Sequence, residues 1–80
     1  MIDASALVAI LLRESDAAAI GQRIEAAEAP FTSPLAIYET VARLVRVRGV
    51  SAFKAEQIVR ALLDEFDARI VAVDDAMTSH

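Results

Sequence analysis

The sequence predicts an α/β fold in which short parallel strands alternate with pairs of helices. Serine or aspartate stands before most stretches with helical spacing, and short apolar segments follow the helices. The chain has 80 residues, of which 56% are hydrophobic and 25% charged, so it is too apolar for a disordered segment. Strands separated by helices favour a parallel sheet with right-handed crossovers. The expected order is β-α-α-β-α-α-β in one domain, residues 1–80.

The N-terminal part predicts a strand, two helices and a second strand. Residues 1–3 form the first, very short strand. Ser5 is the predicted N-cap of a helix over residues 6–13, which is apolar all round and therefore buried on most sides. Ser15 is the predicted N-cap of a second helix, which ends at Pro30, just before the second strand, Phe31–Thr32.

The third helix has the clearest boundaries. A capping Ser33 stands before Pro34, the residue favoured at the first helical position, and Gly49 is the usual left-handed stop. Apolar residues at spacings of three and four predict the buried stripe of this helix. That stripe comprises Leu35, Tyr38, Val41, Ala42 and Val45.

The C-terminal part predicts a fourth helix and a third strand. Ser51 caps the helix, whose apolar stripe has the most regular period in the chain. The stripe comprises Ala55, Ile58, Val59, Leu62, Leu63 and Phe66. Residues 69–73 are predicted to be a buried parallel strand, and Asp74 or Asp75 to cap a further helix that the sequence barely begins.

Composition excludes several classes of site. The net charge of −4 does not suggest nonspecific nucleic-acid binding by the whole chain, although residues 43–60 are strongly basic between two acidic segments. That basic segment is either a solvated helix pair or a phosphate-facing rim. The chain has no cysteine, and Gly21 and Gly49 are isolated, which argues against thiolate metal sites and phosphate loops. A single histidine nearly excludes a Ser-His-Asp site.

Membrane insertion and export are not expected. The longest apolar run, Ala4–Leu12, has nine residues, whereas a membrane span needs about 20. A signal peptide has a basic stretch before its apolar run, and here Asp3 occupies that place. We therefore expect a cytoplasmic protein.

Asp3 and Glu39 are the candidate site residues. Asp3 ends the first strand, with Ser5 beside it, and Glu39 lies near the start of the third helix, next to its apolar stripe. Since parallel strands end at the same edge of a sheet, the two carboxylates can converge there, as Mg²⁺ or Mn²⁺ would require. The alternatives are that Asp3 only stabilises a helix N-terminus and that Glu39 only pairs with Arg43.

Three further residues have ambiguous roles. Asp74 and Asp75 follow the third strand at the same edge and are caps or metal ligands. His80 is the last residue, where a frayed terminus is the usual setting.

Two stretches carry a resemblance to a known family. The opening MIDASALVAIL, with Asp3 and Ser5, resembles the start of PIN-domain ribonucleases, in particular VapC-type toxins of bacterial toxin–antitoxin modules. Thr32-Ser33 followed by Glu39-Thr40 resembles their second motif. The resemblance covers the whole chain in element order. It implies a three-layer α/β/α fold.

The resemblance also implies an activity and partners. It implies a Mg²⁺- or Mn²⁺-dependent endoribonuclease with three or four acids, of which Asp3 and Glu39 would be the first two and Ser5 a supporting residue. RNA would be the substrate and a VapB-type antitoxin the partner. Family members are longer, about 130 residues by resemblance, and no residue here matches their later acids. We therefore expect the chain to be incomplete at its C-terminus and inactive alone.

A rival hypothesis is a non-catalytic PIN-like interaction module that binds a twin or an antitoxin. In this hypothesis Asp3 and Glu39 are vestigial. The high hydrophobic content of so short a chain predicts surface that a partner covers, and hence a homodimer.

Overall fold

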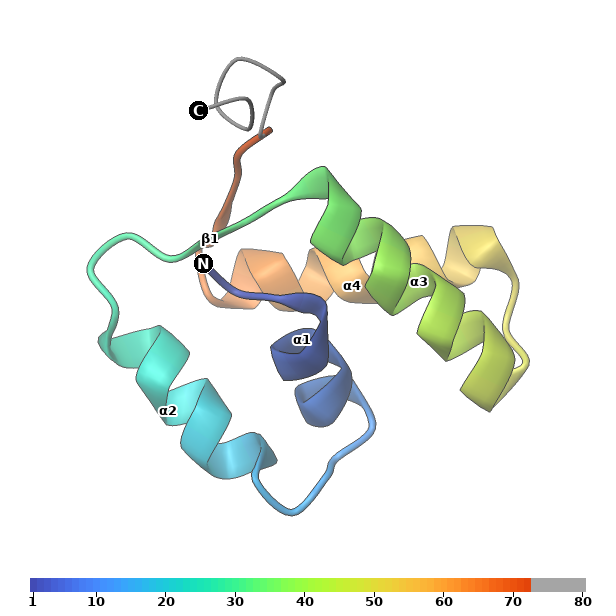
Figure 1. Cartoon of the computed structure of the whole chain (residues 1–80), viewed down its shortest axis with the longest axis horizontal. Coiled ribbons are helices and arrows are strands. Elements are labelled where there is room, and N and C mark those ends of the chain that lie inside the picture. The colour runs from blue at the N-terminus through green and yellow to red at the C-terminus, as the bar shows by residue number, and fades with distance from the viewer. Residues whose placement is uncertain (73–80) are drawn as a thin grey trace, which may run out of the picture.

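The computed structural model of the protein describes residues 1–72 and is a mixed α/β structure, mostly helical, with a short parallel sheet (Figure 1). This confirms the predicted class. The elements are α1 (Ala4–Leu11), α2 (Ala17–Ala26), β1 (Phe31–Thr32), α3 (Pro34–Arg48), α4 (Ala52–Glu65) and β2 (Arg69–Ile70).

The sheet has two strands among the described residues. β1 and β2 run parallel, with Phe31 opposite Arg69 and Thr32 opposite Ile70. The backbone N–H of Val71 donates to the Thr32 carbonyl at 2.8 Å, so pairing reaches just past β2. The helical pair α3–α4 connects the two strands, as expected for a parallel crossover.

The predicted first strand is not formed. Residues 1–3 have no strand geometry, although the backbone N–H of Ile2 donates to the Phe31 carbonyl at 2.7 Å. Asp3 is the N-cap of α1, so only Ile2 is hydrogen-bonded to β1 where a whole strand was expected. The described part of the chain therefore has two strands instead of three, and Ile2 is hydrogen-bonded to the edge of β1 that does not pair with β2.

The predicted third strand is shorter and more exposed than expected. Only Arg69–Ile70 is a strand, and Ile70 and Val71 are 44% and 37% exposed. No described element covers these side chains, which is why the apolar run is not buried. Val73, at the predicted end of this strand, lies outside the described residues.

Two of the predicted helix caps are wrong. Asp3, not Ser5, is the N-cap of α1, and Ser5 lies within its first turn. Asp16, not Ser15, precedes α2 and makes no side-chain cap bond. Aspartate and serine cap almost equally well, so sequence alone could not choose between neighbouring candidates.

The predicted boundaries of α3 and the start of α4 are confirmed. Ser33 Oγ accepts from the Ala36 backbone N–H, and Ser51 Oγ accepts from that of Lys54, both at 3.1 Å. Gly49 ends α3 with φ of 68°, a conformation that a Cβ atom disfavours.

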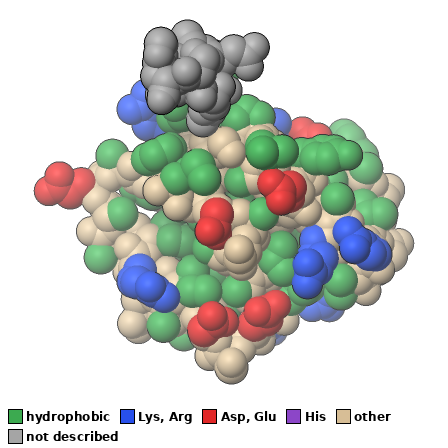
Figure 2. Space-filling view, viewed as in Figure 1, with side chains coloured by type: hydrophobic (Ala, Val, Ile, Leu, Met, Phe, Trp, Pro, Cys, Tyr) green, Lys and Arg blue, Asp and Glu red, His purple; other side chains and the backbone are tan. Residues whose placement is uncertain are grey.

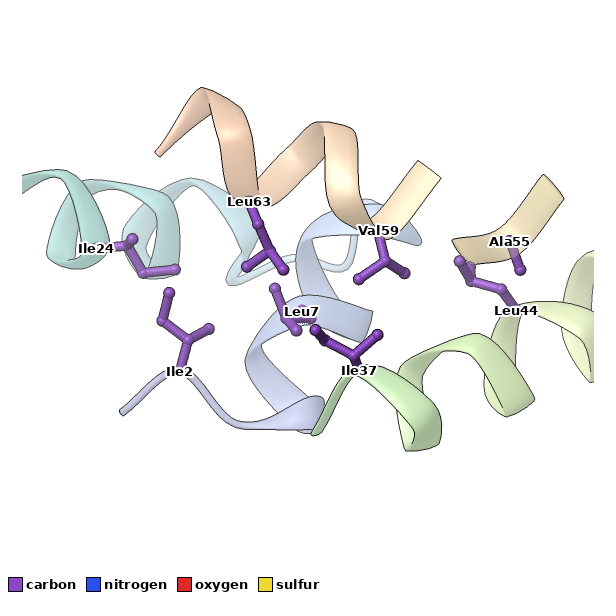
Figure 3. Packing of buried hydrophobic residues seen from close by; sticks show 8 residues of the cluster. All are labelled: Ile2, Leu7, Ile24, Ile37, Leu44, Ala55, Val59 and Leu63. Carbon is purple, nitrogen blue, oxygen red and sulfur yellow. The ribbon is translucent and has the colours of Figure 1, made fainter. Parts of the chain in front are cut away.

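The hydrophobic core lies where α1 packs against α2 and α3, and α3 against α4. Leu7 of α1 is fully buried among the core side chains of α3 and α4 (Figure 3). Ala55, Val59 and Leu63 confirm the predicted inner stripe of α4. The core comprises Ile2, Leu7, Ile24, Ile37, Leu44, Ala55, Val59 and Leu63.

The predicted buried stripe of α3 is wrong at Leu35 and Tyr38, which are 65% and 67% exposed. Val41 and Val45 of the same stripe are half-buried and pack against the core, but the fully buried face is a different set of residues. α3 is apolar on two sides, and its spacing alone does not indicate which side meets the core. The buried residues are Ala36, Ile37, Thr40 and Leu44.

The described helices do not include one that is long and apolar enough to cross a membrane. The longest, α3, has 15 residues, whereas a span needs about 20.

Candidate metal centre at the starts of α1 and α3

Asp3 occupies the N-terminus of α1. Its backbone is extended, and its Oδ1 accepts a hydrogen bond from the Ala6 backbone N–H at 2.9 Å. The side chain is exposed. One carboxylate oxygen therefore caps the helix, and the other has no protein donor among the described residues.

The segment around Asp3 is tied to β1 by two bonds. The Ile2 N–H donates to the Phe31 carbonyl, and the Thr32 hydroxyl donates to the Ile2 carbonyl, both at 2.7 Å. Thr32 is fully buried. These bonds place the N-cap of α1 directly beside the end of β1, where α3 begins.

The start of α3 is equally well anchored. Ser33 is buried and caps the helix, and the fully buried Thr40 donates its hydroxyl proton to the Ala36 carbonyl at 2.7 Å. Glu39 directly precedes Thr40, so its backbone lies on a fixed part of the helix.

Glu39 is exposed, contrary to the expectation that it borders a buried face. It borders the outer apolar side of α3, which faces away from the core. The alternative pairing with Arg43 is not formed; the ion pair found in the described part of the chain joins Arg60 to Glu56 at 2.9 Å. Glu39 thus keeps both carboxylate oxygens available.

Asp3 and Glu39 come from the N-terminal halves of two helices that pack on each other. Acidic side chains lie over the start of α1 and the N-terminal half of α3 on the face shown in Figure 2. Within residues 1–72, no three His, Cys, Asp or Glu side chains are grouped so that they could hold a metal ion. The described residues therefore provide at most two carboxylates, those of Asp3 and Glu39, for binding a metal ion at this place.

A cavity of about 570 Å³ lies between α1 and α2. Asp3 and Ser5 line it, and Glu39 does not. Glu14, Asp16 and Arg23 also line this cavity, and the sequence analysis did not single them out. Only the packing of α2 against α1 brings them there, so no local signal could have found them.

Asp74, Asp75 and His80 lie outside the described residues.

Comparison with protein families identifies the class of this chain. The family model for the PIN domain matches residues 1–80. The chain therefore belongs to the PIN-domain family, whose members are generally nucleases, often in toxin–antitoxin systems, and typically use divalent metal ions. No curated protein and no solved structure matches the chain.

Proposed function

We propose that this protein is a metal-dependent endoribonuclease toxin of a VapC-type toxin–antitoxin system. The observation that carries the proposal is the placement of Asp3 at the N-cap of α1, beside the end of β1, in a chain that matches the PIN-domain family throughout. RNA is the proposed substrate, and Asp3 and Glu39 are the proposed metal ligands, with Ser5 in support.

The donor chemistry fits a hard divalent cation. One carboxylate oxygen of Asp3 caps α1, and the other is left to bind a cation. Glu39 is exposed and forms no ion pair within residues 1–72. Carboxylate oxygens with water in the remaining positions suit Mg²⁺ or Mn²⁺. Ser5 is exposed in the first turn of α1 and lines the same cavity as Asp3, where its hydroxyl can orient a water molecule.

A bound Mg²⁺ or Mn²⁺ supplies Lewis-acid stabilisation of charge on the phosphate and a more acidic water. The protein itself holds the carboxylate that would bind the metal in a fixed position. Asp3 Oδ1 accepts from the Ala6 N–H, and the preceding residue, Ile2, donates its N–H to the Phe31 carbonyl and accepts from the Thr32 hydroxyl at its own carbonyl. A fixed carboxylate matters because the reacting groups must meet within a fraction of an ångström.

Exposed basic residues support RNA as the substrate. The C-terminal half of α3 and the start of α4 carry Arg43, Arg46, Arg48 and Lys54, all exposed and outside the Arg60–Glu56 ion pair. Exposed cations attract phosphates and release the counterions of the nucleic acid. An RNA substrate is in keeping with a cytoplasmic protein.

The proposed partners are a VapB-type antitoxin and a second copy of the chain. The apolar side chains left on the surface support both, since Leu35, Tyr38 and Phe53 are each more than 60% exposed. Exposed apolar patches mark interaction sites.

A cleavage assay tests the enzymatic proposal. With only two candidate acids in residues 1–72, we expect the 80-residue chain to cut single-stranded RNA no faster than its Asp3→Asn variant. If the natural protein continues beyond residue 80, the longer form should cut in Mg²⁺ or Mn²⁺, and EDTA should stop it. Failure of the longer form to cut RNA would contradict the proposal. Asp3-dependent, EDTA-sensitive cleavage by the 80-residue chain would show a complete site.

A non-catalytic interaction module is the second candidate function. It is favoured by the cap bond of Asp3, which gives this residue a structural role without any metal. In this case Asp3→Asn would change neither metal binding nor RNA binding, and the exposed apolar surface would account for the protein's activity through a partner.

A further inference from the structure

A cavity of about 520 Å³ lies where the C-terminal ends of α1 and α3 meet the loop before α4. Its charged lining within residues 1–72 consists of Arg13 and Arg48, and both side chains are exposed. The rest of its lining is aliphatic and comprises Leu11, Leu44, Val50 and Ile58. The cavity therefore combines an aliphatic surface with two cations.

Arg13 has a backbone conformation that is unfavourable for an arginine. Its φ is 55°, in the left-handed region. The Glu14 N–H donates to the Ala9 carbonyl at 2.9 Å, and the Arg13 N–H donates to the Ile10 carbonyl at 3.2 Å. These two bonds form the Schellman end of a helix, where glycine is the usual residue. Asp67 shares the positive φ, but aspartate tolerates it better. The helix end therefore does not explain why an arginine stands at position 13.

Neither arginine of the cavity is neutralised within residues 1–72. The ion pair found there joins Arg60 to Glu56, and Glu14 lines the cavity between α1 and α2 instead. A helix C-terminus attracts cations, which accounts for the position of Arg48 but not for the aliphatic cavity beside it. Guanidinium groups bind carboxylates and phosphates through paired hydrogen bonds, so the cavity is suited to an anionic ligand with an apolar group.

A protein segment fits this cavity better than RNA does. Bases of single-stranded RNA bind to proteins largely by stacking on aromatic side chains, and the lining residues of this cavity include no aromatic one. Its aliphatic surface suits a side chain such as leucine. Arg13 and Arg48 belong to different parts of the chain, so two carboxylates, one on each side of the leucine, can neutralise both of them.

We propose that this cavity binds an acidic segment of a partner protein. One bulky aliphatic side chain of the segment packs against Leu11 and Ile58, and neighbouring carboxylates pair with Arg13 and Arg48. Asp3 lies at the opposite end of α1, a helix about 12 Å long, so the bound segment leaves it accessible. Only Arg48 is shared with the cations proposed to attract RNA. The inference goes beyond the proposed function and depends on neither metal binding nor cleavage.

Fluorescence anisotropy of the 80-residue chain with a labelled peptide tests the site. The probe is a short peptide with one central leucine between glutamates, measured with EDTA at physiological ionic strength. We expect saturable binding with a Kd on the order of 10⁻⁴ M. Replacing the leucine of the peptide by alanine should weaken binding about tenfold, and replacing its glutamates by glutamines about fivefold. Absence of saturable binding, or equal binding of all three peptides, would overturn the proposal.

Substitutions in the protein separate the cavity from general attraction to cations. Arg48→Gln should weaken peptide binding about fivefold. Arg43→Gln is the matched control, since it makes the same charge change on the exposed surface of the same helix but outside the cavity, and it should bind like the wild type. Equal loss in these two variants would show that the peptide responds to net charge and would overturn the proposal.

Arg13→Gly separates binding from stability. It should weaken peptide binding about fivefold, yet unfold at the same or a higher urea concentration than the wild type, because glycine adopts this φ without strain. An Arg13→Gly variant that binds the peptide normally, or that is less stable than the wild type, would mean that Arg13 serves the helix end. Single-stranded RNA that binds in an Arg13-dependent manner, while the peptide does not bind, would assign the cavity to nucleic acid and overturn the proposal.

Discussion

The Thr32 hydroxyl donates a buried hydrogen bond of 2.7 Å to the carbonyl oxygen of Ile2, thirty residues earlier in the chain. This bond joins the residue before the N-cap of α1 to the residue before the N-cap of α3. The two candidate metal ligands, Asp3 and Glu39, follow these anchored points. This hydroxyl and the bond from the Ile2 N–H to the Phe31 carbonyl together fix the start of α1 beside β1.

Replacing that hydroxyl should destabilise the fold. Thr32→Val keeps the shape of the side chain but leaves the Ile2 carbonyl without its donor, so we expect a loss of about 1–3 kcal/mol in the free energy of unfolding. Urea denaturation followed by circular dichroism measures it. Thr40→Val is the matched control: its hydroxyl bonds to the Ala36 carbonyl, which also takes part in the α-helical hydrogen-bond ladder, so its loss should cost less. Equal costs would contradict this account.

Two substitutions of Asp3 separate capping from metal binding. Asparagine can still accept from the Ala6 N–H, so Asp3→Asn should unfold at nearly the same urea concentration as the wild type. Asp3→Ala loses the cap and should be less stable by about 1 kcal/mol. An Asp3→Asn variant as unstable as Asp3→Ala would mean that the negative charge, not the hydrogen bond, stabilises α1.

Metal binding should be weak and should depend on both carboxylates. With two acids and water as ligands, we expect a Kd for Mn²⁺ on the order of 10⁻³ M. Asp3→Asn should abolish binding and Glu39→Gln should weaken it, as measured by the loss of the free Mn²⁺ signal in electron paramagnetic resonance. Glu56→Gln removes an acid from α4 and should have no effect. Tight binding that persists in Asp3→Asn would place the metal elsewhere.

The burial of Leu44 can be checked by truncating it and, for comparison, an exposed apolar residue of the same helix. Leu44 is 3% exposed, so Leu44→Ala should cost about 2–5 kcal/mol through the cavity it leaves. Val47 is 52% exposed, and Val47→Ala should change stability by no more than about 0.5 kcal/mol. Thermal or urea denaturation gives both values. Similar values for the two variants would contradict the burial seen here.

The sequence predicted those parts of the fold that depend on neighbouring residues. Ser33 before Pro34, Gly49 and Ser51 define the ends of α3 and the start of α4 because capping and left-handed stops act over a few residues. The inner stripe of α4 was also predictable, because this helix has one apolar side, with Val59 and Leu63 at its centre. Asp3 was predicted as a candidate from its place at the end of a first strand, whereas the structure makes it the N-cap of α1.

Only the tertiary structure decided which groups meet. α3 has two apolar sides, and contacts with α1 and α4 select the side of Leu44 over that of Tyr38. The packing of α2 against α1 likewise makes Arg23 and Asp16 line the same cavity as Asp3. Strand formation likewise depends on distant partners: Ile2 finds one bond to β1, and Ile70 pairs with Thr32 but stays exposed. Local signals fix where helices begin and end, whereas burial and pairing depend on residues that approach only when the chain folds.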